Sequence, residues 1–248
     1  MGAVFQTDPD DGIRLEGASI KLADRVVLQD ITAHLTEKRI AILGRNGSGK
    51  TTLLRLMAGL VIPDAGVVRV EGIDPATERK AMLSRIGILF QNPDHQIIFP
   101  TVGEELAFGL IQQGRSRKEA EAEVERILAA ENRSHWQRAP VTSLSYGQRQ
   151  YLCLLAILAM KPGTILLDEP FAGLDIPTRT RLHRRIAALP QRVVAITHDP
   201  AEIEGYDRAI WIEEGRLRAD NGAMDVIARF ESEMKQLGHA DADTDLRS

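Results

Sequence analysis

The chain has 248 residues, of which 44% are hydrophobic and 27% are charged, and its formal net charge is −4. This length and composition predict a globular protein that buries its core without disulfides or structural metals, and the acidic balance argues against nucleic acid as a partner. No apolar run reaches the roughly 20 residues that a membrane-spanning helix needs, and the polar, acidic N-terminus is not expected to be a secretory leader. The single cysteine, Cys153, excludes an internal disulfide, and its apolar surroundings favour a buried, inert thiol over a reactive one.

The first part of the chain is predicted to hold strands around a glycine-rich loop. Residues 1–12 are expected to form a flexible tail, and apolar stretches that alternate with polar ones over 13–35 indicate antiparallel strands. The loop at 44–49 is followed by apolar residues over 50–59 whose spacing predicts a helix. Short apolar runs predict further strands at 39–43, 67–70 and 86–90.

The second part changes to a helical pattern and then back to alternating strands and helices. Residues about 92–160 are expected to form an inserted, mostly helical subdomain, because the helical pattern there carries a charged face. The apolar runs at 164–167 and 193–197 flank a predicted helix at 177–189. This alternation favours a parallel sheet covered by helices.

The C-terminal part predicts a closing hairpin at 209–212 and 216–218. Residues 231–248 are polar and are expected to form a disordered tail. The fold class expected for 13–230 is therefore α/β, with a parallel sheet at its core, an antiparallel β subdomain and an inserted helical subdomain.

The glycine-rich loop lies between a buried strand and a helix, which is the context of a phosphate-binding P-loop. Its glycines let successive backbone amides point at one anion, and the following helix adds the partial positive charge of its N-terminus. Lys50 is expected to neutralise β- and γ-phosphate oxygens, and Thr51 to place its hydroxyl on Mg²⁺. A glycine turn that merely connects strand and helix is the alternative, and the complete motif disfavours it. The residues expected to contact ATP here are Gly44, Arg45, Asn46, Gly47, Ser48, Gly49, Lys50, Thr51 and Thr52.

Two carboxylates, Asp168 and Glu169, end the apolar run at 165–167. Asp168 is expected to hold Mg²⁺ opposite Thr51, and Glu169 to polarise the attacking water as the general base. Solvated charges at a strand end are the alternative, but the P-loop in the same chain favours the catalytic interpretation.

A third motif precedes an apolar helical pattern and reads Leu144-Ser145-Tyr146-Gly147-Gln148. Ser145 and Gln148 have capping-box spacing, so Ser145 is a predicted N-cap at a helix start suited to an anion. With the P-loop and the acidic strand end, this motif resembles the signature of ABC ATPases, which has glycine in place of Tyr146. The resemblance extends over about 15–221. A tyrosine at positive φ is costly, but Gly147 is retained and the site is expected to work.

The resemblance implies an ABC-type nucleotide-binding domain that works as a dimer. ATP is then bound between the P-loop of one chain and the signature of the other, which presents Ser145, Tyr146, Gly147 and Gln148. Because one chain alone has no complete site of this kind, the resemblance predicts either a homodimer or a dimer with a paralogous ATPase.

Four smaller elements are also assigned by the resemblance. Gln91 matches the Q-loop glutamine that reaches the metal and the attacking water, Asp175 matches the D-loop that links the two sites, and His198 matches the switch histidine that contacts the γ-phosphate. A histidine after a strand is otherwise more often structural. The family usually supplies an aromatic ring to stack on adenine, but 19–24 contains none, so Leu22 or Val27 is expected to pack on the base.

The stretch 91–102, extended by 104–109, resembles the ATPases of energy-coupling-factor (ECF) importers, which take up vitamins and transition-metal ions. In that family it docks on a membrane partner, and Ile97, Ile98 and Phe99 would suit this role, with core packing as the alternative. The resemblance implies a coupling subunit, a substrate-binding membrane subunit, and a peripheral place on the cytoplasmic face of the membrane. Biotin and cobalt or nickel are the leading substrates.

Two other functions are weighed against the importer ATPase. A soluble ABC ATPase of translation or DNA repair usually has two nucleotide-binding domains or a long coiled coil between P-loop and signature, whereas Lys50 and Ser145 are too close for this and no heptads occur between them. A regulatory module with a dead site is conceivable from Tyr146, but intact Lys50, Asp168 and Glu169 disfavour it.

Overall fold

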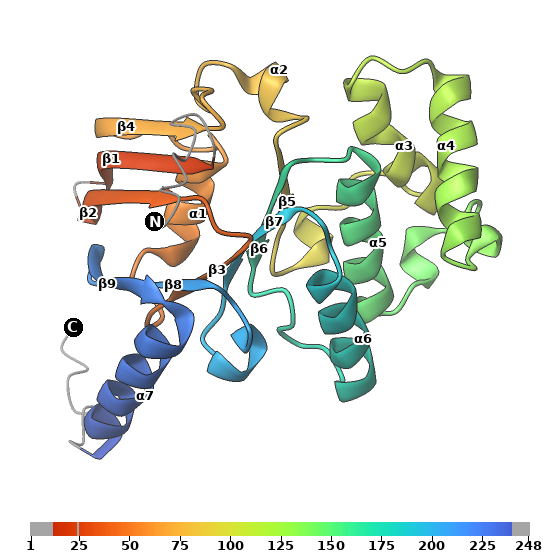
Figure 1. The fold of residues 1–248 in the computed structure, drawn as a ribbon. Coiled ribbons are helices and arrows are strands. Elements are labelled where there is room, and N and C mark those ends of the chain that lie inside the picture. The colour runs from red at the N-terminus through yellow and green to blue at the C-terminus, as the bar shows by residue number, and fades with distance from the viewer. Residues whose placement is uncertain (1–11, 24, 240–248) are drawn as a thin grey trace, which may run out of the picture.

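The computed structural model describes residues 12–23 and 25–239 and contains two sheets with helices packed around them (Figure 1). The strands are β1 (Ile13–Leu22), β2 (Arg25–Leu35), β3 (Arg39–Leu43), β4 (Ala65–Val70), β5 (Ile86–Leu89), β6 (Thr164–Asp168), β7 (Arg192–Ile196), β8 (Arg208–Glu213) and β9 (Arg216–Gly222). The α-helices are α1 (Lys50–Met57), α2 (Arg79–Met82), α3 (Val102–Gln112), α4 (Arg117–Ala130), α5 (Tyr146–Ala159), α6 (Ile176–Ala187) and α7 (Ala223–His239). Short 3-10 helices are η1 (Pro93–His95), η2 (Ser134–Trp136), η3 (Val141–Ser143) and η4 (Pro200–Ile203).

The larger sheet has the strand order β5-β6-β7-β3-β8-β9. Its first five strands run parallel, and β9 pairs antiparallel with β8 as the predicted closing hairpin. β6 is buried along its whole length, and β3 and β7 are buried after their first residue, as strands covered on both faces are. The predicted α/β fold class is confirmed.

The smaller sheet has the order β2-β1-β4 and is antiparallel throughout. Buried and accessible residues alternate along much of β1 and β2, because only one face of this sheet meets the core. That core joins Leu15 of β1 and Ile31 of β2 to Leu53 and Leu54 of α1 and to Ile42 of β3. Helix α1 is therefore held between the two sheets, which fixes the glycine-rich loop that precedes it.

The helices α3, α4 and α5 share a separate core that includes Leu106, Val124 and Leu152 (Figure 1). α5 also packs against the larger sheet, since Cys153 and Leu154 belong to the cluster that covers β6 and β7. Burial raises the pKa of the Cys153 thiol to about 12, so the interpretation of an inert thiol is supported.

The prediction of a disordered tail from residue 231 is wrong as far as residue 239, because α7 extends to His239. Val226 and Phe230 are buried four residues apart on this helix, and partly buried Met234 continues the same face. The ring of Phe230 meets that of Trp211 edge-on at 5.4 Å between centroids. The polar composition of the segment concealed this apolar face. Residues 1–11 of the predicted N-terminal tail, and 240–248, lie outside the described residues.

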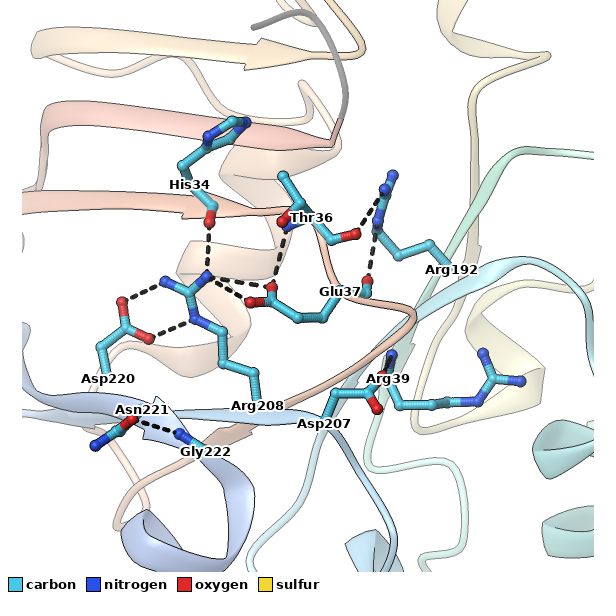
Figure 2. A network of polar contacts seen from close by, with 10 residues as sticks. All are labelled: His34, Thr36, Glu37, Arg39, Arg192, Asp207, Arg208, Asp220, Asn221 and Gly222. Carbon is cyan, nitrogen blue, oxygen red and sulfur yellow. Dashed lines mark hydrogen bonds and ion pairs between the residues drawn. The ribbon is translucent and has the colours of Figure 1, made fainter. Parts of the chain in front are cut away.

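Arg208, at the start of β8, holds together segments that are far apart in the sequence (Figure 2). Its guanidinium makes a bidentate pair with Asp220 of β9, at 2.6 and 2.7 Å, and donates to the backbone oxygen of His34 at 2.7 Å. It also lies 3.2 Å from Glu37, and only 18% of its side chain is exposed. The network joins the smaller sheet to β8 and β9.

We expect Arg208→Ala to lower the free energy of unfolding by about 3 kcal/mol, because it leaves the poorly exposed Asp220 carboxylate without its cation. Urea denaturation measures this as a lower midpoint at an unchanged slope. The control is Arg117→Ala, which removes an 82% exposed arginine paired with Glu121 and should cost no more than about 0.5 kcal/mol. Equal midpoints for the two variants would show that the Arg208 network adds nothing beyond a surface ion pair.

Candidate nucleotide-binding and hydrolytic site

The predicted site residues gather at one edge of the larger sheet. The strands β5, β6, β7 and β3 are parallel neighbours, so their carboxyl ends lie side by side. Gln91 follows β5, Asp168 and Glu169 end β6, His198 follows β7, and the glycine-rich loop follows β3. This edge is where ligands bind in open α/β sheets.

The glycine-rich loop has a backbone that other residues would not tolerate. Gly44 and Gly49 have φ values of 153° and 106°. A Cβ at Gly44 would lie 2.2 Å from the backbone oxygen of Ile212, and one at Gly49 would lie 2.9 Å from that of Val27. Glycine is therefore required at both ends of the turn.

Lys50 folds back over this loop. Its Nζ donates to the backbone oxygens of Gly44 at 2.7 Å and Arg45 at 2.9 Å. Burial lowers the pKa of Lys50, and the nearby carboxylates of Glu169, Asp168 and Glu213 act in the opposite direction. The hydroxyl of Ser48 is buried and makes no hydrogen bond to any residue that the structure describes. The loop thus offers an ammonium group and an unsatisfied hydroxyl, a donor set that fits a phosphate.

Thr51 and Asp168 form the pair predicted to hold Mg²⁺. The Thr51 hydroxyl donates to Asp168 Oδ1 at 3.2 Å. Burial raises the pKa of Asp168, as does the neighbouring Glu169, while the bond from Thr51 lowers it. Across 12–23 and 25–239, no group of three or more His, Cys, Asp or Glu side chains is placed to hold a metal unaided. Two hard oxygen ligands fit Mg²⁺, which takes most of its remaining ligands from water and substrate phosphates.

The Glu169 carboxylate is held from both sides. Gln91 donates through Nε2 to Glu169 Oε2 at 3.1 Å, and His198 Nδ1 lies 3.3 Å from Oε1. Glu169 also has a φ of 45°, a left-handed conformation that is unfavourable for a residue with a side chain. Such strain is found at functional sites, where the surrounding structure holds the residue in place. The structure therefore brings Gln91, Glu169 and His198 together. This arrangement fits a general base, Glu169, whose carboxylate is oriented by two partners.

The signature begins α5 as a capped helix. Ser145 is its N-cap and accepts from the Gln148 amide at 3.3 Å, while Gln148 Oε1 accepts from the Ser145 amide at 2.8 Å. The predicted capping box is confirmed. Tyr146 is the first helical residue, so the strain of a tyrosine at positive φ does not arise. Gly147 is needed for packing, since a Cβ there would lie 2.5 Å from Thr178 Cγ2.

Asp175, which is predicted to belong to the D-loop, caps α6 and accepts from the amide of Thr178 at 2.8 Å. This hydrogen bonding lowers the pKa of Asp175. Asp175 lines a cavity of about 530 Å³ together with Ser145, Gly147 and Gln148. The glycine-rich loop lines other cavities, so the signature and the P-loop of one chain do not share a cavity among those found in the described structure.

A cavity of about 570 Å³ extends from the P-loop toward the β1–β2 hairpin, and its outer wall is made by Arg25, Val26 and Val27. Leu22 and Val27 are the two predicted base contacts. Val27 lines this cavity, whereas Leu22 is 49% exposed and pairs with Arg25 across the hairpin. No aromatic residue lines this wall, as the sequence implied. Sequence reasoning missed Arg25 and Val26; their place opposite 19–22 in a predicted hairpin was the available signal.

Comparisons with known proteins agree with these motifs. A family model described as ABC transporter matches residues 28–172. The biotin transport ATP-binding protein BioM of Rhodobacter capsulatus is 51% identical over 216 residues, covering 87% of this chain and 92% of that protein. BioM of Rhizobium etli is 42% identical over 225 residues, covering 88% and 97%.

A solved structure of CbiO1 from Clostridium perfringens, described as part of the ABC transporter complex cbiONQ, matches with a TM-score of 0.73. It is 26% identical and covers 91% of this chain and 94% of that one. These relatives do not favour the alternative of an ATPase of translation or DNA repair. Because the family model matches more than half of the chain, and because relatives above 30% identity span most of it, this chain belongs to the ABC transporter family as a subunit that binds and hydrolyses ATP.

Proposed function

We propose that the chain is the energy-coupling ATPase of an importer for biotin. The observation that carries this is the 51% identity to a biotin transport ATP-binding protein over 87% of the chain. Cobalt or nickel is the second candidate substrate, and it is supported by the likeness to CbiO1, which is more distant at 26% identity. No described helix is long and apolar enough to cross a bilayer. The proposed membrane partners are supported by the likeness to CbiO1, which is described as part of the cbiONQ transporter complex.

The proposed catalytic unit is a dimer, either of two copies of this chain or with a paralogous ATPase. The separate cavities support this, because Ser145 and Gly147 do not line the cavities of the P-loop in the same chain, and a second chain would supply its own signature there. The capped N-terminus of α5 and its free amides would face the γ-phosphate. ATP therefore favours the closed dimer, and hydrolysis removes the contact and favours opening.

In the proposed reaction Glu169 accepts a proton from the attacking water, while Gln91 and His198 keep its carboxylate in place. Lys50 balances the charge of the β- and γ-phosphates. Mg²⁺, when held at Thr51 and Asp168, with Gln91 as a further ligand, would neutralise phosphate charge. Val27, with Arg25 and Val26, lines this cavity and is proposed to border the adenine base, with the exposed Leu22 beside them across the hairpin.

The proposed membrane-docking surface is Ile98 with the groove beside it. Ile98 is 69% exposed, whereas Ile97 packs against two core clusters and the Phe99 ring lies 5.1 Å from that of Phe108. The groove, about 670 Å³, is lined in part by Phe99 and Phe108. Its lining of apolar and charged side chains suits an amphipathic helix of a membrane subunit, which would hold this chain at the cytoplasmic face.

Affinity purification from native membranes in mild detergent tests this proposal, with mass spectrometry of the recovered proteins. We expect two small integral membrane proteins, and loss of both with Ile98→Asp but not with Ile62→Asp, a matched change at an equally exposed isoleucine (64%). Vesicles containing the recovered complex should take up labelled biotin rather than cobalt when supplied with ATP. Recovery of ribosomes or repair proteins, or of no membrane protein, would refute the importer function.

A further inference from the structure

The first turns of α5 are tied to the Q-loop segment by three side chains on one helix face. Tyr146 donates its hydroxyl to the backbone oxygen of Gln91 at 2.9 Å. Gln150 donates to the backbone oxygen of Phe90 at 3.2 Å, and Arg149 pairs with Asp94 at 2.8 Å. Positions 146, 149 and 150 have the spacing of neighbours on a helix surface, so all three meet the same segment.

The Tyr146 bond differs from the other two because it ends on Gln91 itself. The side chain of Gln91 in turn donates to Glu169 at 3.1 Å. The hydroxyl of Tyr146 is thus separated from the proposed general base by only one residue. A hydrogen bond at the Gln91 backbone limits where its side-chain amide can reach, and general-base catalysis is sensitive to such placement.

Local packing keeps the Tyr146 side chain in this position. Tyr146 is half-buried, and its ring lies beside Gly173, where a Cβ would be in ordinary van der Waals contact with Tyr146 Cε1 at 3.5 Å. Burial raises the pKa of Tyr146, and the Asp94 carboxylate raises it further, so the hydroxyl stays protonated and able to donate well above neutral pH. The tyrosine therefore contacts the Q-loop and the D-loop while it begins the signature helix.

We propose that Tyr146 is a positioning residue for ATP hydrolysis, whose hydroxyl fixes the Q-loop so that the Gln91 amide stays on Glu169. This inference rests on the proposed roles of Gln91 and Glu169. The glycine that ABC signatures usually have at this position offers no such bond. The substitution at Tyr146 is then a gain of a contact and not a damaged motif.

A double-mutant cycle between Tyr146 and Gln91 tests the proposal. We expect Tyr146→Phe, which keeps the ring and removes the hydroxyl, to lower kcat by about 3-fold to 10-fold, the effect of one hydrogen bond. KM for ATP should stay within about twofold, because the P-loop that binds the nucleotide is untouched. In the Gln91→Ala background the same change should have no further effect, since there is no amide left to position.

The control is Tyr151→Phe, five residues further along α5, which removes a hydroxyl bonded to Glu131 and not to the Q-loop. It should leave kcat unchanged. Thermal denaturation of each variant shows whether a loss of rate reflects a loss of fold.

Three results would overturn the inference. An unchanged kcat in Tyr146→Phe shows that the hydroxyl positions nothing, and a raised KM at unchanged kcat assigns it to nucleotide binding. If Tyr146→Phe lowers kcat by the same factor in the wild-type and Gln91→Ala backgrounds, the hydrogen bond has a purely structural role. Gln91→Ala alone separates this from the proposed function: if that variant keeps the wild-type kcat, the role of Gln91 fails first and the inference falls with it.

Discussion

Glu169→Gln is expected to lower ATP turnover by about 100-fold to 10,000-fold while ATP binding is retained. Glutamine keeps the size of the side chain and one oxygen, but it cannot take a proton from the attacking water. Glu169 contacts Gln91 and His198, at 3.1 and 3.3 Å, and neither of these groups lies in the glycine-rich loop that is expected to bind the phosphates. Single-turnover measurement of phosphate release, with nucleotide binding followed separately, gives both quantities.

The same variant should accumulate as an ATP-bound dimer. If hydrolysis opens the closed state, a chain that binds ATP and cannot hydrolyse it remains in that state. Light scattering after size-exclusion chromatography should show the mass of a dimer with ATP and Mg²⁺, and a smaller mass with ADP.

The control for Glu169→Gln is Glu204→Gln, which makes the same chemical change at an exposed carboxylate on the loop after η4. It should keep the turnover and the nucleotide-dependent mass of the wild type. Wild-type turnover in Glu169→Gln would refute the assignment of Glu169 as the general base and would direct attention to His198.

The positions of the predicted site residues follow from local sequence combined with one topological rule. Buried apolar runs that alternate with helices predict parallel strands, and parallel strands bring the residues after them to one edge. Gln91, Asp168 and His198 are far apart in the sequence, yet each directly follows or ends such a run. The capping box of Ser145 and Gln148 could be predicted from the spacing of these two residues alone.

Other features depend on contacts between distant segments, which a single sequence does not reveal. Arg208 forms a hydrogen bond to His34, which is 174 residues away in the sequence, and the sequence pattern of neither segment predicts that bond. The apolar face of α7 consists of three spaced residues in a segment whose C-terminal part is polar in composition. It is recognised as a buried face only from its packing against Trp211, which the sequence does not show. Of the three apolar residues predicted to dock, only Ile98 is exposed, because burial of Ile97 depends on how α5 packs.

The role of Tyr146 shows a further limit of motif comparison. As a departure from the usual signature it suggested backbone strain, but its backbone is helical and its hydroxyl bonds to Gln91 at 2.9 Å. The sequence shows that tyrosine replaces glycine at position 146. The effect of this replacement depends on a hydrogen-bond partner 55 positions away, which the sequence does not identify.

Lys50→Ala is expected to weaken ATP binding by about 10-fold to 150-fold, the effect of losing hydrogen bonds from a charged donor at 1.4 kcal/mol per factor of ten. The Lys50 side chain is buried against the loop, where its amine donates to the Gly44 and Arg45 carbonyls. The loss also leaves the Gly44 and Arg45 carbonyls without this donor. Isothermal titration with ATP and Mg²⁺ measures the affinity directly.

Thermal stabilisation by ATP gives an independent measure of the Lys50→Ala effect, since a ligand that binds only the folded state stabilises it in proportion to RT ln(1 + [L]/Kd). At one ATP concentration well above the wild-type Kd, Glu169→Gln should be stabilised strongly and Lys50→Ala much less. The matched control is Lys80→Ala, which removes an exposed ammonium from α2 and should bind as the wild type does. If Lys50→Ala bound ATP with wild-type affinity, the nucleotide would have to lie elsewhere than on the glycine-rich loop. The assignments of Thr51 and Asp168, which depend on phosphates placed there, would then fail as well.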